Sequence, residues 1–321
     1  MTIVRSRSQY DAVIVGGGPA GLNAALVLAR CGRRVLVIDA GKPRNYASKH
    51  LHNFLSRDGV DPTRLLTLGR EELAGHNVEL MSGKVVAARC GRQVFSSRVG
   101  GVTETLRSRT LLLATGVKDE LPAISNAADF YGHGVHHCPY CDAWEHRGQP
   151  MCAYGVGPGG VGLAMSLQTW SPHVTVVTNG VPLTGAERRR ANKYDLTVRT
   201  DHITELRSAR GRLAPTRRDP LGSVGFAPGP PIVVSAMFFN TEKLQRSTLP
   251  LRLGCRLNAE GGVVHDRKQR TGVRGLYLAG DASFDVQFAI VAAAEGAKAG
   301  VAMNRDMQDW DRTLSIKPAD R

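Results

Sequence analysis

Residues 12–21 read Ala12-Val13-Ile14-Val15-Gly16-Gly17-Gly18-Pro19-Ala20-Gly21. The four apolar residues predict a buried strand, and Gly16, Gly18 and Gly21 follow it in the spacing G-x-G-x-x-G. The first glycine permits a tight turn, the second lets phosphates approach the backbone, and the third lets a helix pack on the strand. Residues 22–30 have the composition of that helix. The stretch therefore predicts a Rossmann-type dinucleotide-binding unit, with a pyrophosphate at the positive end of the helix.

The second strand of this unit, residues 35–38, ends at Asp39, which lies 23 residues after Gly16. That distance is close to the roughly 20 residues expected for the acid that binds a ribose. Two later apolar strands end in Ala114-Thr115-Gly116 and in Gly280-Asp281. Asp281 is a candidate ligand of a ribityl hydroxyl, and the next helix is expected to stabilise the reduced flavin with its N-terminus. Gly280-Asp281 alone also fits an ordinary turn, but the three features together favour FAD.

A second unit of the same kind begins near residue 151, with strands over residues 151–154 and 174–177 and a helix over residues 161–170. Its glycines, Gly155, Gly157 and Gly160, repeat the spacing. Such a repeat predicts an α/β fold of two Rossmann-type, three-layer domains. After residue 242 the chain is expected to return to the first domain, so the second domain is expected to be inserted into the first. We assign residues 1–117 and 242–321 to a discontinuous FAD-binding domain. Residues 118–241 form the inserted, NAD(P)H-like domain.

Smaller features complete this organisation. Residues 85–113 predict three strands joined by turns, and a long Ala-rich helix is expected over residues 287–307. The stretch 208–231, rich in Arg, Gly and Pro, is expected to include an exposed turn region. The polar tail from Trp310 is expected to be loosely held.

Cys138-Pro139-Tyr140-Cys141 is the close cysteine pair of the chain. Two intervening residues allow a small disulfide ring, and such pairs often contain one thiol of depressed pKa. Asp142 follows and is a candidate to move a proton, while His136 and His137 are candidates to stabilise a thiolate or to act as a base. A structural role for each histidine stays open.

Two rival interpretations of the cysteine pair are less consistent with the sequence. A zinc site would need a second C-x-x-C or a distant His pair, and neither completes the set, so we predict no metal. A glutaredoxin shares Cys-Pro-Tyr-Cys but is a small domain without paired Rossmann units. The remaining cysteines, Cys31, Cys90, Cys152 and Cys255, are expected to be small apolar residues.

The chain is basic, since 42 Lys and Arg against 28 Asp and Glu give a net charge of +14. This charge favours an acidic partner. The basic residues are scattered, apart from Arg188-Arg189-Arg190, and lack interleaved aromatics, so we expect an acidic redox protein and no nucleic acid. A solvated basic surface without a special partner stays open. No apolar run approaches the roughly 18 residues of a membrane helix, so we expect no membrane association. The N-terminus lacks a signal-peptide pattern, so a cytoplasmic location is expected.

Together these motifs resemble the low-molecular-weight thioredoxin reductase family over about residues 10–309. The resemblance rests on residues 16–21, 114–116, 138–142, 155–160 and 277–281. It implies the discontinuous FAD domain and a homodimer. It also implies that Asn53 and Gln287-Phe288-Ala289 lie near the flavin, that Cys141 faces the flavin, and that Cys138 attacks the substrate.

The chain departs from this family after the second strand of its second unit. The reductases carry a His-Arg-Arg motif there, which binds the 2′-phosphate of NADPH. This chain has Thr178-Asn179-Gly180, which offers neither an acid for NADH nor an arginine pair for NADPH. Arg188, Arg189 and Arg190 come later and are not expected to substitute. The pattern is similar to the branch that lacks the NADPH motif, which includes gliotoxin- and holomycin-type dithiol oxidases; Arg44-Asn45 is also similar to that branch.

The sequence therefore predicts an FAD-dependent thiol–disulfide oxidoreductase. Electrons would pass between FAD, the Cys138–Cys141 pair and an external dithiol or disulfide, without NADPH as an efficient donor. The direction stays open. The chain either reduces a thioredoxin-like protein with electrons from another donor, or oxidises a small-molecule dithiol and passes electrons to oxygen. A non-catalytic, flavin-binding redox sensor is the alternative from another class.

Overall fold

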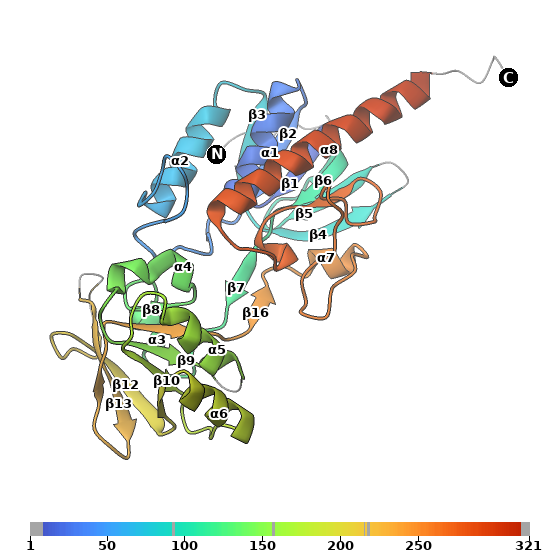
Figure 1. Cartoon of the computed structure of the whole chain (residues 1–321). Helices are drawn as coiled ribbons and strands as arrows, with labels where there is room; N and C mark the ends of the chain where they lie inside the picture. Colours follow the sequence, from blue (N-terminus) through green and yellow to red (C-terminus); the bar gives the residue numbers. More distant parts are fainter. Residues whose placement is uncertain (1–8, 92–93, 156–157, 215, 217–218, 316–321) are drawn as a thin grey trace.

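A computed structural model of the chain describes residues 9–91, 94–155, 158–214, 216 and 219–315. Gly157 lies outside these residues. Figure 1 shows two α/β bodies, one above the other, with a pair of short strands between them. The upper body contains both ends of the described chain, and the middle of the chain forms the lower body. The predicted α/β class, with two Rossmann-type units, is confirmed.

The upper domain is built on a seven-stranded sheet in the order β3-β2-β1-β6-β5-β4, with β17 paired to β6. Strands β1, β2, β3, β6 and β17 are parallel neighbours, whereas β4, β5 and β6 form an antiparallel meander, as predicted. The strands are β1 (Tyr10–Val15), β2 (Val35–Asp39), β3 (Val78–Ser82), β4 (Val85–Cys90), β5 (Phe95–Val99), β6 (Thr105–Leu113) and β17 (Leu276–Leu278). The helices are α1 (Pro19–Arg30), α2 (Pro62–Leu73), α7 (Leu249–Arg252) and α8 (Ala289–Ser315), with a 3-10 turn η2 (Asp281–Ser283).

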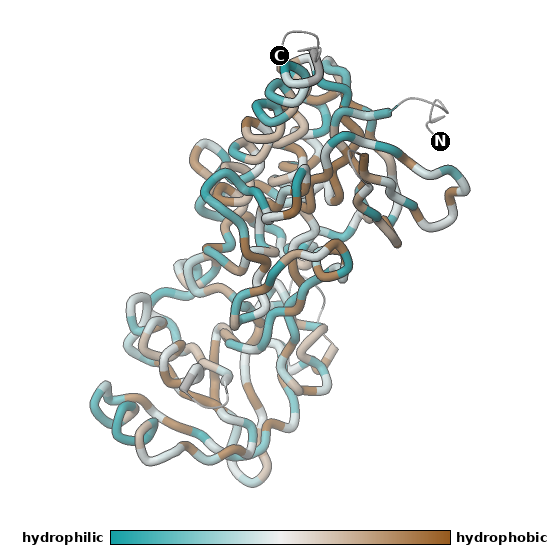
Figure 2. The backbone as a smooth tube through the Cα atoms, turned by 90° about the vertical axis from the view of Figure 1, so that its right-hand side faces the viewer, coloured by the Kyte–Doolittle hydropathy of each residue, from teal (hydrophilic) through white to brown (hydrophobic). Residues whose placement is uncertain are grey.

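Two apolar layers bury the two faces of this sheet. On one face α1 and α8 pack against each other and cover Ile14, Val37 and Leu112. On the other face the meander and α7 cover Val13 and Leu111. Figure 2 shows hydrophobic segments inside the upper body. Strands with both faces buried read as continuous apolar runs, which is why residues 12–15 and 111–113 are uninterrupted hydrophobic stretches.

The lower domain repeats the plan with a five-stranded parallel sheet in the order β11-β10-β9-β15-β8. A smaller antiparallel sheet, β12-β13-β14, packs beside it. The strands are β8 (Val135–His136), β9 (Met151–Tyr154), β10 (Val174–Val177), β11 (Thr197–Arg199), β12 (His202–Ser208), β13 (Leu221–Ala227), β14 (Ile232–Val233) and β15 (Ala236–Phe239). The helices are α3 (Ala127–Phe130), α4 (Pro139–Asp142), α5 (Pro158–Leu167) and α6 (Gly185–Lys193), with a 3-10 turn η1 (Trp144–His146).

The two bodies are joined by an antiparallel strand pair, β7 (Val117–Asp119) and β16 (Lys243–Gln245). Asp119 lies opposite Lys243, and Val117 lies opposite Gln245. The chain leaves the upper domain through β7 and returns through β16 (Figure 1).

The stretch 208–231 includes the expected exposed turn at residues 209–214, and it also contains β13, whose apolar residues pack into the core of the lower domain. Two sequence expectations need correction. Residues 310–315 of the tail are not loose, because α8 continues to Ser315, and the rest of the tail lies outside the described residues. The Arg274 guanidinium lies 5.1 Å from the Trp310 ring centroid, and Asp311 is ion-paired with Arg109. Of the lone cysteines, Cys152 and Cys255 are buried, but Cys31 and Cys90 are exposed.

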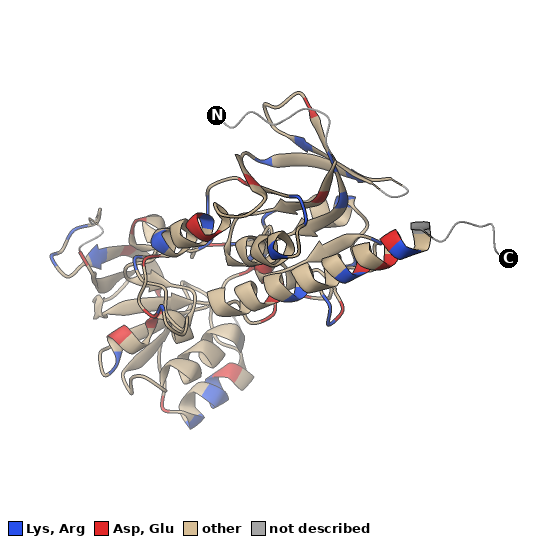
Figure 3. Cartoon of the chain, turned by 90° about the horizontal axis from the view of Figure 1, so that it is seen from above, with Lys and Arg blue, Asp and Glu red and all other residues tan. Residues whose placement is uncertain are grey.

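The charged residues are scattered over the described chain, as the sequence suggests. Figure 3 shows Lys and Arg on helices and loops of both domains, with Asp and Glu among them. None of the described helices is long and apolar enough to cross a bilayer.

Helix α6 offers a test of local stability. Thr184 caps it by accepting a hydrogen bond from the Glu187 backbone, and the Glu187 side chain accepts one from the Thr184 backbone. Thr184→Ala removes this capping box and is expected to lower the free energy of unfolding by ~1 kcal/mol. Denaturant unfolding of both proteins measures the difference. An unchanged midpoint would show that the cap does not limit stability.

Candidate functional site

The glycine turn after β1 is shaped to admit a dinucleotide. Gly16 has φ +113°, and a Cβ atom there would lie 2.1 Å from the carbonyl oxygen of Ala114. A Cβ atom at Gly21 would lie 1.9 Å from the carbonyl oxygen of Gly16. At Gly18 a Cβ atom would meet nothing within 4 Å, and no side chain caps α1. The turn is closed on the protein side and open toward the helix N-terminus, where a pyrophosphate binds in such folds.

Other predicted cofactor residues lie at the C-terminal edge of the same sheet. Asp39 ends β2 beside Gly17, and its carboxylate is ion-paired with Arg70 at 2.9 Å. The Thr115 hydroxyl is buried and has no hydrogen-bond partner among the described residues. Gly116 follows it with φ +64°. Gly280, two residues after the end of β17, has φ +82°, and Asp281 follows. An orphaned buried hydroxyl next to an open glycine turn fits a bound FAD, which would supply the missing partner.

The cysteine pair forms a disulfide in the lower domain. Cys138 and Cys141 are bonded, with Cα atoms 5.3 Å apart. Cys138 is the N-cap residue of α4, and Cys141 lies inside this one-turn helix. Both are partly exposed, whereas the lone Cys152 is buried, and this burial raises the pKa of its thiol. The structure therefore presents one accessible disulfide, at the predicted pair.

Behind the disulfide, Asp142 is paired with a histidine. Its carboxylate lies 3.3 Å from His136 Nδ1. Burial opposes ionisation of Asp142, but the charge and hydrogen bond of His136 outweigh it and lower the pKa of the carboxyl. The His146 ring lies 5.7 Å from that of His136, and burial, aided by His136, lowers the pKa of His146 to about 4. Asp142 is therefore a carboxylate at neutral pH, held by the His136 ring.

His137 belongs to a different cluster, which faces the upper domain. Its Nδ1 lies 3.3 Å from the Tyr131 hydroxyl, and that hydroxyl donates to Asp119 at 3.1 Å. Asp119 receives two hydrogen bonds from Arg44, at 2.8 and 2.5 Å. Burial, and then the positive charge of Arg44, lower the pKa of His137 to about 4. His137 is therefore neutral at physiological pH.

Arg44 also reaches two of the predicted flavin residues. Its guanidinium donates to the Asp281 carboxylate at 3.0 Å and to the Gln287 amide oxygen at 2.8 Å. Sequence reasoning missed Arg44, Asp119 and Tyr131 as site residues. Arg44-Asn45 was noted only as part of the resemblance, and nothing in the spacing of the three residues marks them as neighbours.

The loop that carries Asn53 lies against α4, the helix that contains the cysteine pair. Asn53 has φ +62°, and its side-chain amide donates to the Tyr140 carbonyl at 2.8 Å. Its backbone N–H donates to Asp58 at 2.8 Å, which holds the loop in shape. The Tyr140 ring lies 6.5 Å from that of Phe288, immediately before Ala289 opens α8. Asn53 and Phe288 thus lie against Tyr140 of the cysteine helix from the upper domain, and Gln287 and Phe288 line a cavity with Cys138.

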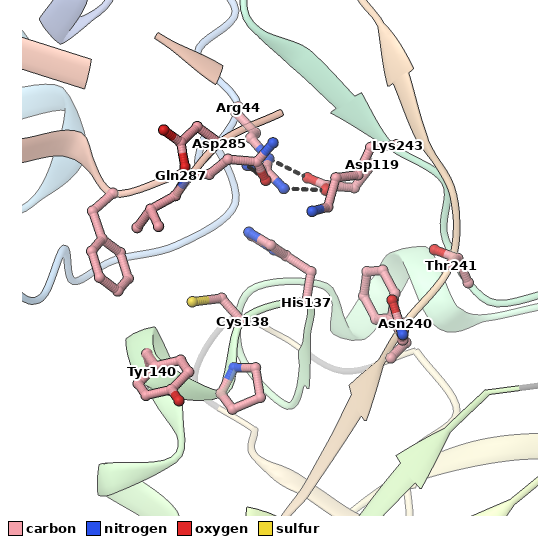
Figure 4. A pocket seen from close by; sticks show the side chains of 14 residues that line it. Arg44, Asp119, His137, Cys138, Tyr140, Asn240, Thr241, Lys243, Asp285 and Gln287 are labelled. Carbon is pink, nitrogen blue, oxygen red and sulfur yellow. Dashed lines mark hydrogen bonds and ion pairs between the residues drawn. The ribbon is translucent and has the colours of Figure 1, made fainter. Parts of the chain in front are cut away.

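A cavity of about 480 Å³ lies where these elements meet. Figure 4 shows the Cys138 sulfur and the His137 ring pointing toward it, with the Arg44–Asp119 pair on the opposite side. Apolar walls come from Phe239, Val286 and Phe288. This volume is within the range of small-molecule sites.

The second Rossmann-type unit has a glycine turn like that of the first unit, but the loop that follows its second strand, β10, is different. A Cβ atom at Gly160 would lie 2.5 Å from the carbonyl oxygen of Gly155, so the close approach of a nucleotide-binding turn is retained. After β10, however, Thr178 is buried, and its hydroxyl donates to the Val181 carbonyl at 2.5 Å. The Asn179 side-chain oxygen accepts from the Ile203 backbone at 2.8 Å.

The end of this loop is packed as well. A Cβ atom at Gly180 would lie 2.2 Å from the His202 ring. The polar side chains of Thr178 and Asn179 are thus hydrogen-bonded to backbone groups of the same domain. Residues 178–180 therefore present no charge where a ribose or phosphate would bind. Arg188, Arg189 and Arg190 lie exposed on α6.

Metal binding finds no support in the described part of the chain, where no group of three or more His, Cys, Asp or Glu side chains is arranged to hold an ion.

Comparison with known proteins places the chain in a family. Residues 10–211 match the family model described as pyridine nucleotide-disulphide oxidoreductase. Thioredoxin reductase tcpT of Claviceps purpurea (strain 20.1) is 30% identical over 283 residues, which cover 84% of this chain and 86% of that protein.

Solved structures agree. The crystal structure of HlmI is 34% identical with a TM-score of 0.89, and the alignment covers 96% of this chain and 95% of that one. An oxidoreductase from Agrobacterium tumefaciens is 28% identical with a TM-score of 0.84, covering 94% and 99%. The chain therefore belongs to the pyridine nucleotide-disulphide oxidoreductases, as an FAD-dependent disulfide oxidoreductase of the thioredoxin-reductase-like type.

Proposed function

We propose that the chain exchanges electrons between FAD, the Cys138–Cys141 pair and an external dithiol or disulfide, without NADPH as an efficient donor. One observation carries this proposal. Cys138 lines the same cavity as Gln287 and Phe288, so an external sulfur and the flavin-site residues have access to one disulfide. The residues around the turn of α1 fit FAD, which would be held by Gly16, Gly18, Gly21, Asp39, Thr115, Gly116, Gly280 and Asp281, with Asn53, Gln287, Phe288 and Ala289 near its ring.

The chemistry of the cysteine pair follows from thiol–disulfide exchange. An incoming thiolate attacks the Cys138 sulfur, the Cys138–Cys141 bond breaks, and its electron pair leaves on Cys141. The second thiol of the substrate gives its proton to neutral His137, which lines the same cavity. The resulting thiolate attacks the substrate sulfur bound to Cys138 and releases Cys138 as a thiolate. The substrate leaves as a disulfide, and two electrons remain on the cysteine pair.

FAD, when bound, supplies the two-electron couple that reoxidises or reduces the pair. Asp142 follows Cys141 in α4 and is paired with His136, and we assign to these two side chains the proton that the Cys141 thiolate takes up or gives away. The same exchange steps run backward when an external disulfide is reduced. Cys138 as the attacking residue and Cys141 as the flavin-facing one is part of the proposal.

The donor is proposed not to be NADPH. The loop over residues 178–180 is closed on its own backbone and on His202, so it offers no arginine pair to a 2′-phosphate. In the reductase direction the partner would be a thioredoxin-like protein, as the names of the relatives suggest, with electrons from another acidic redox protein. The net charge of +14 suits such partners.

A second candidate function is a dithiol oxidase that closes a disulfide in a small molecule and passes electrons to oxygen. The cavity favours it, because about 480 Å³ next to Cys138 accommodates a small molecule and its walls are partly apolar. The redox-sensor alternative predicts no turnover in either direction.

Steady-state assays separate these functions. We expect NADPH and NADH to support less than about 1% of the turnover seen with the preferred donor, since their specificity contacts are missing. Oxygen uptake with dithiols alone identifies an oxidase. Reduction of thioredoxin disulfide by a reduced iron–sulfur protein identifies a reductase. Rapid NADPH-driven reduction of thioredoxin would contradict the donor proposal. If no pair of electron donor and acceptor gives turnover, the redox-sensor alternative remains.

The oligomeric state and the cellular location are also proposals. We propose a homodimer in the cytoplasm, with residues 1–117 and 242–321 as the FAD-binding domain and residues 118–241 as the inserted domain. Light scattering at several protein concentrations tests the dimer.

A further inference from the structure

We propose that Arg44 and Asp119 are positioning residues that couple His137 to the flavin-site residues Asp281 and Gln287, so that the upper domain sets the proton-accepting state of the redox site. This inference rests on the proposed function, in which His137 accepts the proton of the incoming dithiol. It concerns residues on three separate segments, which the fold brings to one side of the cavity (Figure 4).

The first step is the geometry of Arg44. Its side chain is only 12% exposed, and its guanidinium is shared by three acceptor residues: it donates to two oxygens of Asp119, one of Asp281 and the amide oxygen of Gln287. The planar fork of arginine makes such simultaneous contacts in a fixed orientation, which a lysine cannot reproduce. Arg44 thereby ties the start of η2 and the approach to α8 to the linker strand β7.

The second step is the link from Asp119 to the redox motif. The Asp119 side chain is only 5% exposed and accepts a hydrogen bond from Tyr131 at 3.1 Å. The Tyr131 hydroxyl lies 3.3 Å from His137 Nδ1. Since that hydroxyl has one proton, which it donates to Asp119, its oxygen is free to accept from a protonated Nδ1. This arrangement leaves Nε2 of neutral His137 as the nitrogen able to take up a proton.

The third step is the balance of charge around His137. The groups that face it from the elements packed against it are Arg44, Asp119, Tyr131, His136, Asp142 and the apolar Phe239, with Lys243 and Asp285 on the same cavity. Burial is the largest influence on its pKa, and Arg44 is the next, lowering it further. Asp119 and Asp142 act in the opposite direction. Arg44 and Asp119 therefore move the protonation of His137 in opposite senses while they bind each other.

Two substitutions exploit this opposition. Arg44→Gln removes the cation and leaves Asp119, so the pKa of His137 rises toward its usual value and His137 becomes protonated at mildly acidic pH. Asp119→Asn removes the anion and leaves Arg44, so His137 stays neutral to still lower pH. A residue with a purely structural role would change the rate by the same factor at every pH.

The experiment measures anaerobic reduction of the flavin by dithiothreitol between pH 5 and pH 8, per bound flavin. The ratio of variant to wild-type rate cancels the titration of the dithiol itself. For Arg44→Gln we expect this ratio to be flat above pH 7 and to fall by roughly threefold or more at pH 5. For Asp119→Asn no such acidic fall is expected. Arg44→Lys keeps the charge and is expected to restore the flat ratio, even where its rate is lower.

Arg89→Gln is the matched control, since it removes an exposed arginine of β4 away from the site. A pH-independent ratio for Arg44→Gln, or an equal acidic fall for Asp119→Asn, would overturn the coupling. If Arg44→Gln does not retain flavin, the comparison of Arg44→Lys with Asp119→Asn decides it: an acidic fall in either one contradicts the proposal. Failure of the proposed function itself looks different, because wild-type flavin would then not be reduced by the dithiol at any pH.

Discussion

Replacement of Cys138 by serine is expected to abolish dithiol-driven turnover, with a loss of at least about 10³-fold. Serine keeps the size of the side chain but cannot form or break the disulfide with Cys141. Cys138 is partly exposed at the head of α4 and lines the cavity, so we propose it as the sulfur that an external thiol attacks. The rate of dithiol consumption by wild-type and variant protein measures this effect.

Cys141→Ser separates the roles of the two sulfurs. With an external disulfide such as oxidised thioredoxin, the Cys138 thiolate attacks one substrate sulfur and the other sulfur leaves as a thiolate. Because Cys141 is missing, the resulting mixed disulfide between Cys138 and the substrate is expected to accumulate and to be visible by mass spectrometry. Cys31→Ser serves as the control, because Cys31 is exposed but lies outside the site. Mixed disulfide in Cys138→Ser instead of Cys141→Ser would reverse the assigned order of attack.

Gly21→Val is expected to eliminate bound flavin, so that the purified variant is colourless. Any Cβ atom at this position meets the carbonyl oxygen of Gly16 at 1.9 Å, and that contact is with backbone, which cannot move aside as a side chain can. The turn that admits the pyrophosphate and the packing of α1 on β1 depend on the same close approach. The ratio of flavin to protein absorbance after purification measures the loss.

Gly75→Ala is the matched control for this change, since a Cβ atom there meets nothing within 4 Å. It is expected to keep the full complement of flavin. A yellow Gly21→Val protein with the wild-type ratio would show that the turn after β1 does not hold the cofactor, and would place FAD elsewhere in the chain.

The sequence was sufficient to predict the two Rossmann-type units, because their signals are local. In each unit an apolar run and a glycine spacing lie within about 30 residues, and the first unit adds an acid at a set distance. The glycine spacing depends on backbone geometry that only certain residues allow. The Cys138–Cys141 disulfide was predicted for the same reason, since the pair is closed by a single helical turn.

The cluster around Arg44 could not be predicted in this way. Arg44, Asp119 and Tyr131 are separated by up to 87 residues, and each is an ordinary polar residue in its local context. They meet only because β7 leads the chain out of the upper domain past the loop that carries Arg44. A contact of this kind depends on how two domains are placed, which neither periodicity nor a short motif encodes.

The prediction for residues 310–315 failed for a related reason. The segment after Trp310 is polar, which is typical of a loose tail, but polarity on one helix face is compatible with packing on the other. Trp310 lies against Arg274 while Asp311 pairs with Arg109 and Arg33, so the last turns of α8 are held by residues distant in sequence.

The most direct test of the account is an anaerobic mixing experiment that follows the visible absorbance of the flavin. With a stoichiometric amount of a dithiol such as dithiothreitol or reduced thioredoxin, we predict rapid bleaching of the wild-type enzyme and none of Cys138→Ser, with NADPH slow for both. Equal bleaching of both proteins by dithiols, or rapid bleaching of both by NADPH, would contradict the claim that electrons reach this flavin through the Cys138–Cys141 pair.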